Sequence, residues 1–184
     1  PAVAPGGDHL LVAGESALLY SLSIRPLEVA AVTFTEHPAG SVAVPLLTMG
    51  GLVLLCENDQ LESCRLRSWD AARPQEPLVE ANVVRIEGQV VDRPVLRGAQ
   101  LVVASTGERL TAYTVSDNPE KKGLALVGVY KIQDGYGGPM QLALGPDQQF
   151  WLASSAFRRF QVLNDSIRLD QNSTAPGIAS QPLQ

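Results

Sequence analysis

The sequence contains few of the residues that catalysis and metal binding most often use. It has only two cysteines, Cys56 and Cys64, and two histidines, His9 and His37, among 184 residues. None of the four belongs to a CxxC pair, to a group with zinc-ligand spacing or to a Gly-x-Ser-x-Gly motif. The residues therefore predict no catalytic, cofactor-binding or metal-binding site and favour a protein that is not an enzyme. A Ser-His-Asp grouping assembled from distant segments stays open, because its members need not be adjacent.

Each scarce residue type has a structural interpretation. We expect His9 in a turn between strands and His37 in a connection between repeats, where exposed structural histidines are common. Cys56 and Cys64 lie on the two arms of one predicted hairpin. A turn centred on Gln60 would place the thiols directly opposite each other, whereas a two-residue turn at positions 58 and 59 would not. Because a disulfide between strands needs specific geometry, two separate thiols are favoured, and the redox compartment stays undecided.

Clusters of positive charge and long apolar runs are also lacking. The net charge is −5, and the basic doublets are limited to Lys121 with Lys122 and Arg158 with Arg159. A basic face for nucleic acid is therefore disfavoured. The longest apolar stretch, residues 45–56, contains Thr48 and two glycines and is too short to span a bilayer, so no membrane insertion is expected.

Helical periodicity sustained over three turns is absent. The best helical candidate is residues 68–73, which soon meets Pro74 and Pro77. The apolar residues, 45% of the chain, come instead in short runs typical of strands buried on both faces. The composition therefore predicts an all-β protein.

One sequence pattern occurs four times. It consists of a short apolar strand, a glycine-bearing turn, an apolar strand, a polar turn and a further strand. Aligning Leu11, Val53, Val102 and Trp151 in its central strand gives spacings of 42, 49 and 49 residues. This spacing is typical of the four-stranded blades of a β-propeller. We therefore predict about four blades, with cores near residues 3–35, 41–87, 91–133 and 138–170, followed by a flexible tail or linker at 171–184.

The repeats resemble the pyrroloquinoline-quinone-type (quinoprotein-like, PQQ-type) propeller repeat. Residues 94–113 are the copy most similar to that repeat, and residues 10–22 are similar to it too. Typical rings of this family have seven or eight blades, so the chain is either a complete four-bladed ring or part of a larger one. Two copies could also associate as a homo-oligomer that closes one ring. The start at Pro1 fits a processed, excised or partial polypeptide.

The resemblance also implies a function. A quinone-dependent dehydrogenase would need adjacent cysteines, a calcium site and an aromatic cup, whereas this chain has no adjacent cysteines and only 5% aromatic residues. No cofactor is therefore expected. The favoured function is a non-catalytic propeller that binds other protein chains as a scaffold, in the bacterial periplasm or outside the cell. The alternative is part of a ligand-binding or quinone-dependent enzyme propeller whose active site lies in further blades.

Two connections are candidate interaction loops. The first contains Asn118, Glu120 and Lys121, in a stretch whose charge changes from acidic to basic. The second is the glycine-rich segment with Tyr136, Gly137 and Gly138, which a proline and a predicted strand follow. Binding residues are often carried by loops of this kind.

Overall fold

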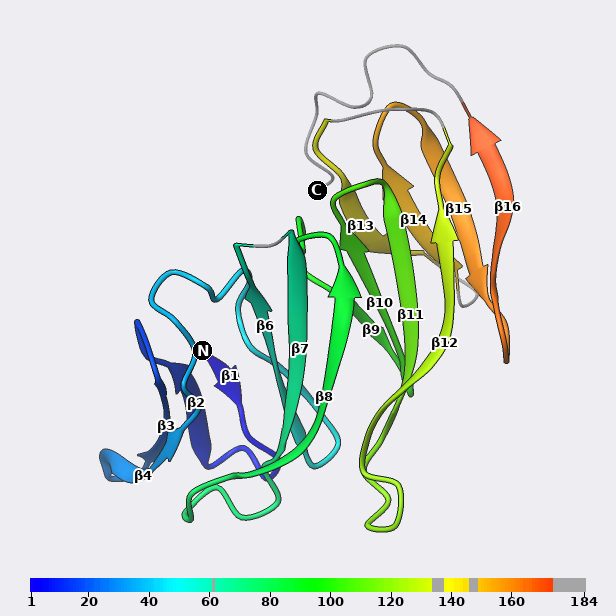
Figure 1. The fold of residues 1–184 in the computed structure, drawn as a ribbon. Coiled ribbons are helices and arrows are strands. Elements are labelled where there is room, and N and C mark those ends of the chain that lie inside the picture. The colour runs from blue at the N-terminus through cyan, green and yellow to red at the C-terminus, as the bar shows by residue number, and fades with distance from the viewer. Residues whose placement is uncertain (61, 134–137, 146–148, 174–184) are drawn as a thin grey trace. The chain divides into compact units, whose positions relative to one another are not determined.

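The computed structural model describes residues 1–60, 62–133, 138–145 and 149–173. Its regular structure consists of β-strands, and no helix occurs in these ranges (Figure 1). Accordingly, the described part of the chain offers no helix of sufficient length and apolarity to cross a membrane. The all-β prediction is confirmed.

The strands form four antiparallel sheets of four strands each, and every sheet is made of consecutive strands. Sheet 1 contains β1 (Ala2–Val3), β2 (His9–Ala13), β3 (Leu18–Ile24) and β4 (Leu27–Phe34). Sheet 2 contains β5 (Leu47–Met49), β6 (Leu52–Asn58), β7 (Ser63–Asp70) and β8 (Val79–Glu87). Sheet 3 contains β9 (Val95–Arg97), β10 (Gln100–Ser105), β11 (Arg109–Ser116) and β12 (Gly123–Lys131). Sheet 4 contains β13 (Gln141–Leu144), β14 (Gln149–Ala153), β15 (Phe157–Val162) and β16 (Ile167–Ser173).

Two local expectations need correction. The helical candidate at residues 68–73 is wrong, because β7 continues to Asp70 and pairs there with Leu52. Tertiary burial of Trp69, which is 1% exposed, outweighs the weak helical preference of this short segment. Strand β16 extends through residues 171–173, which the sequence assigned to the tail, and residues 174–184 lie outside the described residues.

The chain divides into two compact units, each with its own core. Unit 1 comprises residues 1–86 and 116–124, and unit 2 comprises residues 87–115 and 125–184. In unit 1, Leu11 and Leu19 of sheet 1 pack with Val53, Leu55 and Trp69 of sheet 2. Burial of each such large side chain contributes about 1.5–3 kcal/mol.

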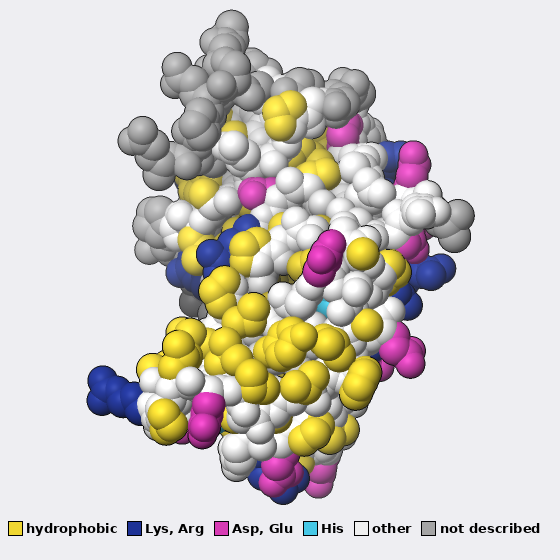
Figure 2. Space-filling view, turned by 90° about the vertical axis from the view of Figure 1, so that its left-hand side faces the viewer, with side chains coloured by type: hydrophobic (Ala, Val, Ile, Leu, Met, Phe, Trp, Pro, Cys, Tyr) yellow, Lys and Arg dark blue, Asp and Glu magenta, His cyan; other side chains and the backbone are white. Residues whose placement is uncertain are grey.

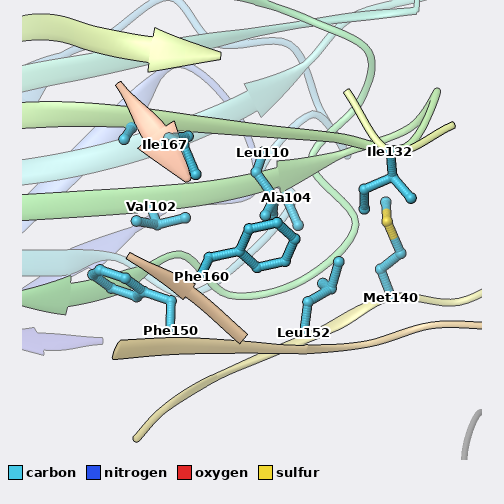
Figure 3. Close-up of a cluster of buried hydrophobic side chains, with 10 residues drawn as sticks. Val102, Ala104, Leu110, Ile132, Met140, Phe150, Leu152, Phe160 and Ile167 are labelled. Atoms are coloured by element: carbon cyan, nitrogen blue, oxygen red, sulfur yellow. The ribbon is translucent and has the colours of Figure 1, made fainter. Parts of the chain in front are cut away.

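The core of unit 2 has the same construction. Val102 and Leu110 of sheet 3 pack with Phe150, Leu152 and Phe160 of sheet 4 (Figure 3). In both units, therefore, the apolar faces of two consecutive sheets cover each other.

Alternation along the strands gives every sheet two distinct faces. In sheets 1 and 3 we call the face that packs on the second sheet of the same unit the front face, and in sheets 2 and 4 we call the face that packs on the first sheet of the unit the back face; the opposite faces take the other name. Leu11 lies on the front face of sheet 1 because it packs with Val53 of sheet 2, and Val102 lies on the front face of sheet 3 because it packs with Phe150 of sheet 4. Trp151 alternates with Phe150 and Leu152 and so lies on the front face of sheet 4.

Val53 is the exception among the four aligned residues. It lies on the back face of sheet 2, and its neighbour Leu54 is the residue in phase with Leu11, Val102 and Trp151. The alignment of the second repeat is thus one residue out. A shift of one residue moves a side chain to the other face of its sheet, and periodicity cannot detect this shift where both faces of a strand are apolar and buried, as in β6.

Candidate functional site

The first predicted interaction loop is a turn of unit 1 on which Asn118, Glu120 and Lys121 lie together, all exposed. The backbone N–H of Glu120 donates to Asn118 Oδ1 at 3.0 Å, and the N–H of Lys121 donates to the Asn118 carbonyl at 2.9 Å. Asn118 therefore organises the turn through its side chain and its backbone. Of the second loop, Tyr136 and Gly137 lie outside the described residues, and Gly138 is half-buried.

The next residue, Lys122, ties the end of this turn to sheet 2. Its Nζ lies 2.5 Å from Asp70 Oδ2, the carboxylate at the end of β7. Burial acts to raise the pKa of Asp70, but the hydrogen bond from Lys122 and one from the backbone N–H of Ala72 outweigh it, so that the pKa lies below its usual value. One end of the loop is thus held by a paired charge.

The histidines differ from expectation. His37 lies in the connection between sheets 1 and 2, as expected, but it is buried. Both ring nitrogens have partners: Nδ1 lies 2.6 Å from the Thr35 hydroxyl, and Nε2 lies 3.2 Å from the Gly14 carbonyl oxygen. A ring with the proton on Nε2 satisfies both contacts, by donating to Gly14 and accepting from Thr35. Thr35 is itself fully buried, so this pair is a structural element of unit 1. His9 opens β2 instead of lying in a turn, and its Nδ1 is 2.9 Å from Asp8 Oδ1.

The two thiols lie on the same face of sheet 2 as diagonal neighbours. Cys56 pairs with Leu66 and Cys64 pairs with Asn58, so neither turn considered from the sequence gives the observed register. Both cysteines are free and buried. The hydrogen bond with Cys64, and after it burial, raises the pKa of the Cys56 thiol well above its usual value. A thiol kept protonated in this way is a poor nucleophile.

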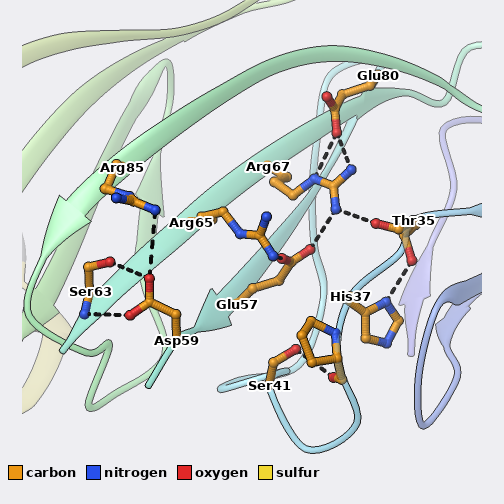
Figure 4. A network of polar contacts seen from close by, with 11 residues as sticks. Thr35, His37, Ser41, Glu57, Asp59, Ser63, Arg65, Arg67, Glu80 and Arg85 are labelled. Atoms are coloured by element: carbon orange, nitrogen blue, oxygen red, sulfur yellow. Dashed lines mark hydrogen bonds and ion pairs between the residues drawn. The ribbon is translucent and has the colours of Figure 1, made fainter. Parts of the chain in front are cut away.

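A polar cluster around Glu57 is the densest set of charged contacts in unit 1 (Figure 4). The Glu57 carboxylate is 1% exposed, and its two oxygens each lie 2.9 Å from a guanidinium nitrogen, one of Arg65 and one of Arg67. Arg65 stands directly opposite Glu57 in the ladder between β6 and β7. The alternating arginines of β7 are a sequence signal that could have indicated this cluster.

Arg67 extends the cluster to three further groups. It donates to Glu80 of β8 and to the Thr35 carbonyl that follows sheet 1, and its guanidinium carbon lies 4.7 Å from the centroid of the Trp69 ring. Burial acts to lower the pKa of Arg67, but hydrogen bonds to Glu80 and Glu57 outweigh it and raise the pKa. The cluster balances two carboxylates with two guanidinium groups, which is the arrangement of a structural brace and not of an acid–base pair.

A pocket of about 420 Å³ lies at one end of sheet 1. Its lining comes from the turn before β2 and from the end of β3 with the residue after it, and it consists of Gly6, Gly7, Asp8, Ser23, Ile24 and Arg25. The lining offers one carboxylate, one guanidinium and one hydroxyl group, and in the described residues no group of three or more His, Cys, Asp or Glu side chains is placed to hold a metal ion.

Within the described residues of unit 1, no other sheet covers the back face of sheet 1. The registers of β1 to β4 place eleven residues on it, all of them hydrophobic side chains: Val3, Leu10, Val12, Leu18, Tyr20, Leu22, Ile24, Leu27, Val29, Val32 and Phe34. None of the eleven is buried. Figure 2 views the side on which β1–β4 lie in Figure 1 and shows hydrophobic side chains gathered over this sheet.

The exposure on this face is large. Leu27 is 75% exposed, Val29 56% and Phe34 79%. The corresponding back faces of sheets 2 and 4 are buried within their units, as Val53 and Phe150 show. A contiguous exposed apolar patch typically marks an interaction site, whereas single exposed hydrophobic residues do not. This face was not predicted from the sequence. Residues 18–22 could have indicated it, because they place apolar side chains on both faces of one strand.

No protein family model and no curated protein matches the sequence. Solved structures match it over most of its length. BamB from Moraxella catarrhalis superposes with a TM-score of 0.61 at 16% identity, over 93% of this chain and 51% of that one. The KlHsv2 protein with its loop 6CD replaced by a Gly-Ser linker gives 0.59 at 15% identity, over 95% and 59%. The computationally designed protein Ika8 gives 0.64 at 8% identity, over 94% and 48%.

This chain has the β-propeller fold. The propeller blades are its four-stranded sheets, as the repeat predicted. The chain spans about half of the length of the solved propellers that it matches.

Proposed function

We propose that this propeller chain is a non-catalytic module of the PQQ-type repeat that binds other protein chains within a larger assembly. The back face of sheet 1 is the observation that carries the proposal. Covering a side chain such as Phe34 or Leu27 with a partner removes it from water, which favours binding by about 1.5–3 kcal/mol per large apolar side chain.

The comparisons support both parts of the proposal. BamB, among the matched structures, is a propeller with PQQ-like repeats. A further match, with a TM-score of 0.55 and 14% identity over 91% of this chain, comes from a structure of S. cerevisiae Dbp5 bound to Nup159 and Gle1. The fold therefore occurs in a complex of several proteins.

The chemistry of the other candidate sites agrees with binding rather than catalysis. The carboxylates of the polar cluster face guanidinium groups, both thiols are buried, and the raised pKa of Cys56 keeps that thiol protonated. Among the described residues the exposed apolar face is thus the feature that needs a partner.

Site-specific photo-crosslinking in the cells that produce this protein tests the proposal. A crosslinking residue replaces Leu27 or Val29 on the back face, and in matched controls it replaces Val79 or Leu126, which are 69% and 61% exposed elsewhere. We expect discrete crosslinked products from the two back-face positions and none from the controls. Absence of products at Leu27 and Val29, or equal products at all four positions, would contradict the proposal.

The turn with Asn118, Glu120 and Lys121 remains a second proposed contact. Its backbone is held by the hydrogen bonds of Asn118, and its charged side chains are exposed. A crosslinking residue at Glu120 tests it in the same cells, and a product from this position identifies the molecule that the turn contacts.

A further inference from the structure

Sheets in this chain pair by one rule, a front face against a back face. In unit 1 the front face of sheet 1 packs on the back face of sheet 2, and in unit 2 the front face of sheet 3 packs on the back face of sheet 4. The complement of the uncovered back face of sheet 1 is therefore the front face of another blade.

The front face of sheet 4 is such a face. The face is mixed in character. The registers place Ala143, Trp151, Ala153 and Phe157 on it, together with Gln141, Gln149, Arg159, Gln161 and Arg168. The rings of Trp151 and Phe157 stack with their centroids 4.6 Å apart. Both rings are half-buried. Large aromatic side chains of this kind are the usual anchors of protein interfaces.

We propose that two copies of this chain associate head to tail, with the front face of sheet 4 of one copy on the back face of sheet 1 of the other. The inference rests on the proposed function, because it names the occupant of the same face. An apolar surface provided by β1 to β4 would then receive the Trp151 and Phe157 pair. The contact would repeat between copies the pairing of faces found inside each unit.

The size of the face suits a weak contact. With strands about 4.8 Å apart and a rise of about 3.3 Å per residue, β1 to β4, which have two, five, seven and eight residues, present roughly 350 Å². One contact would bury roughly 700 Å² over both partners, which is the size of a weak, reversible interface. Two copies also provide about the length of the solved propellers, of which this chain spans about half.

Two charged groups lie on this face, Arg159 and Arg168, and both are near the Asp170 carboxylate. Arg159 lies over the Trp151 ring, 5.8 Å from its centroid, and its guanidinium is 2.7 Å from the Asp170 carboxylate. Arg67 has the same surroundings in unit 1, an aromatic ring and a carboxylate, and only 14% of its side chain is exposed. An arginine paired in this way is therefore accommodated next to packed sheets, since its partner is buried with it.

Sedimentation of the 184-residue chain tests the inference. The variants are Val29→Lys on the back face of sheet 1, Phe157→Lys on the front face of sheet 4, and Val79→Lys as a matched control on the fourth strand of sheet 2. We expect the wild type and V79K to reach at least twice the 19.6 kDa of one chain at concentrations of roughly 0.1–1 mM, and V29K and F157K to stay at one chain. Circular dichroism verifies that each variant keeps its β structure.

A mixing experiment separates this arrangement from others. An equimolar mixture of V29K and F157K retains one intact contact, so we expect it to form a species of two chains. A monomeric wild type, or a mixture that stays monomeric, overturns the inference. Loss of association in V29K but not in F157K also overturns it and indicates back face against back face. If the crosslink from Leu27 joins a different protein, the inference fails while the proposed function stands; if Leu27 and Val29 give no product, both fail.

Discussion

At the scale of single residues, Glu57 is a buried carboxylate held between two guanidinium groups. Its carboxylate is 1% exposed, and both oxygens face guanidinium groups. Replacing Glu57 with Gln keeps the shape but leaves Arg65 and Arg67 without this partner. Loss of one member of a buried ion pair costs up to 3–5 kcal/mol, and because Arg67 keeps Glu80 we expect a fall of about 2–3 kcal/mol in the free energy of unfolding, measured by urea titration.

Glu76→Gln is the matched control for this prediction. It removes the same charge from a pair with Arg73, but Glu76 is 53% exposed and Arg73 72%. Exposed pairs contribute little, so we expect a change below about 0.5 kcal/mol. Equal effects of E57Q and E76Q would show that the cluster around Glu57 is not a brace.

At the scale of elements, the connection after β8 depends on a glycine. Gly88 has φ +81°, and a Cβ there would lie 2.3 Å from the backbone oxygen of Thr106, whose N–H donates to the Gln89 carbonyl at 2.8 Å. Gly98 also has positive φ, +52°, but a Cβ there would meet nothing within 4 Å. We expect Gly98→Ala to cost about 1–2 kcal/mol from the backbone alone, and Gly88→Ala about 1–3 kcal/mol more from the clash.

Urea unfolding of the two variants, each compared with the wild type, measures this difference. The two variants introduce the same methyl group at glycines with left-handed backbone, so the difference between them isolates the contact with Thr106. Equal destabilisation by the two substitutions would mean that the turn around Thr106 moves away at little cost.

The same scale shows what the sequence could predict. Short apolar runs separated by turn residues indicated four sheets, since a strand needs only local alternation and a turn to be recognised. The sequence could not predict which residues of a strand lie on its front face where both faces are apolar. For this reason Val53 was placed one residue out of phase. The pairing of Cys56 with Leu66 depends on the length of the connection between β6 and β7, which composition alone does not define.

The candidate sites were less predictable, because their contacts join residues from different strands and sheets. The burial of His37 depends on Thr35 and Gly14, and the brace around Glu57 depends on β8 and on the segment after sheet 1. These partners become neighbours only when the sheets form. The back face of sheet 1 is different, because its residues alternate within single strands and could have been recognised once the phase of β2 and β3 was known.

At the scale of the whole molecule, net charge and the apolar face act in opposite directions. Each copy carries a net charge of −5, so that two copies repel each other, whereas the eleven hydrophobic residues of the back face favour contact. The repulsion is screened by salt, since the Debye length falls from about 30 Å at 0.01 M to about 3 Å at 1 M. We therefore expect the dissociation constant of the wild-type assembly to fall roughly tenfold between about 0.02 and 0.5 M NaCl.

Lowering the pH from 7.5 toward the isoelectric point near 5.0 also lowers the dissociation constant, because protonation removes the negative charge that makes the copies repel each other. Sedimentation equilibrium over a grid of salt concentrations and pH values measures both effects. V29K is the control, for which no association is expected at any salt concentration, because a lysine on the apolar face must lose its hydration in the contact. A dissociation constant that rises with salt would mean that opposite charges, and not the apolar face of sheet 1, hold the copies together.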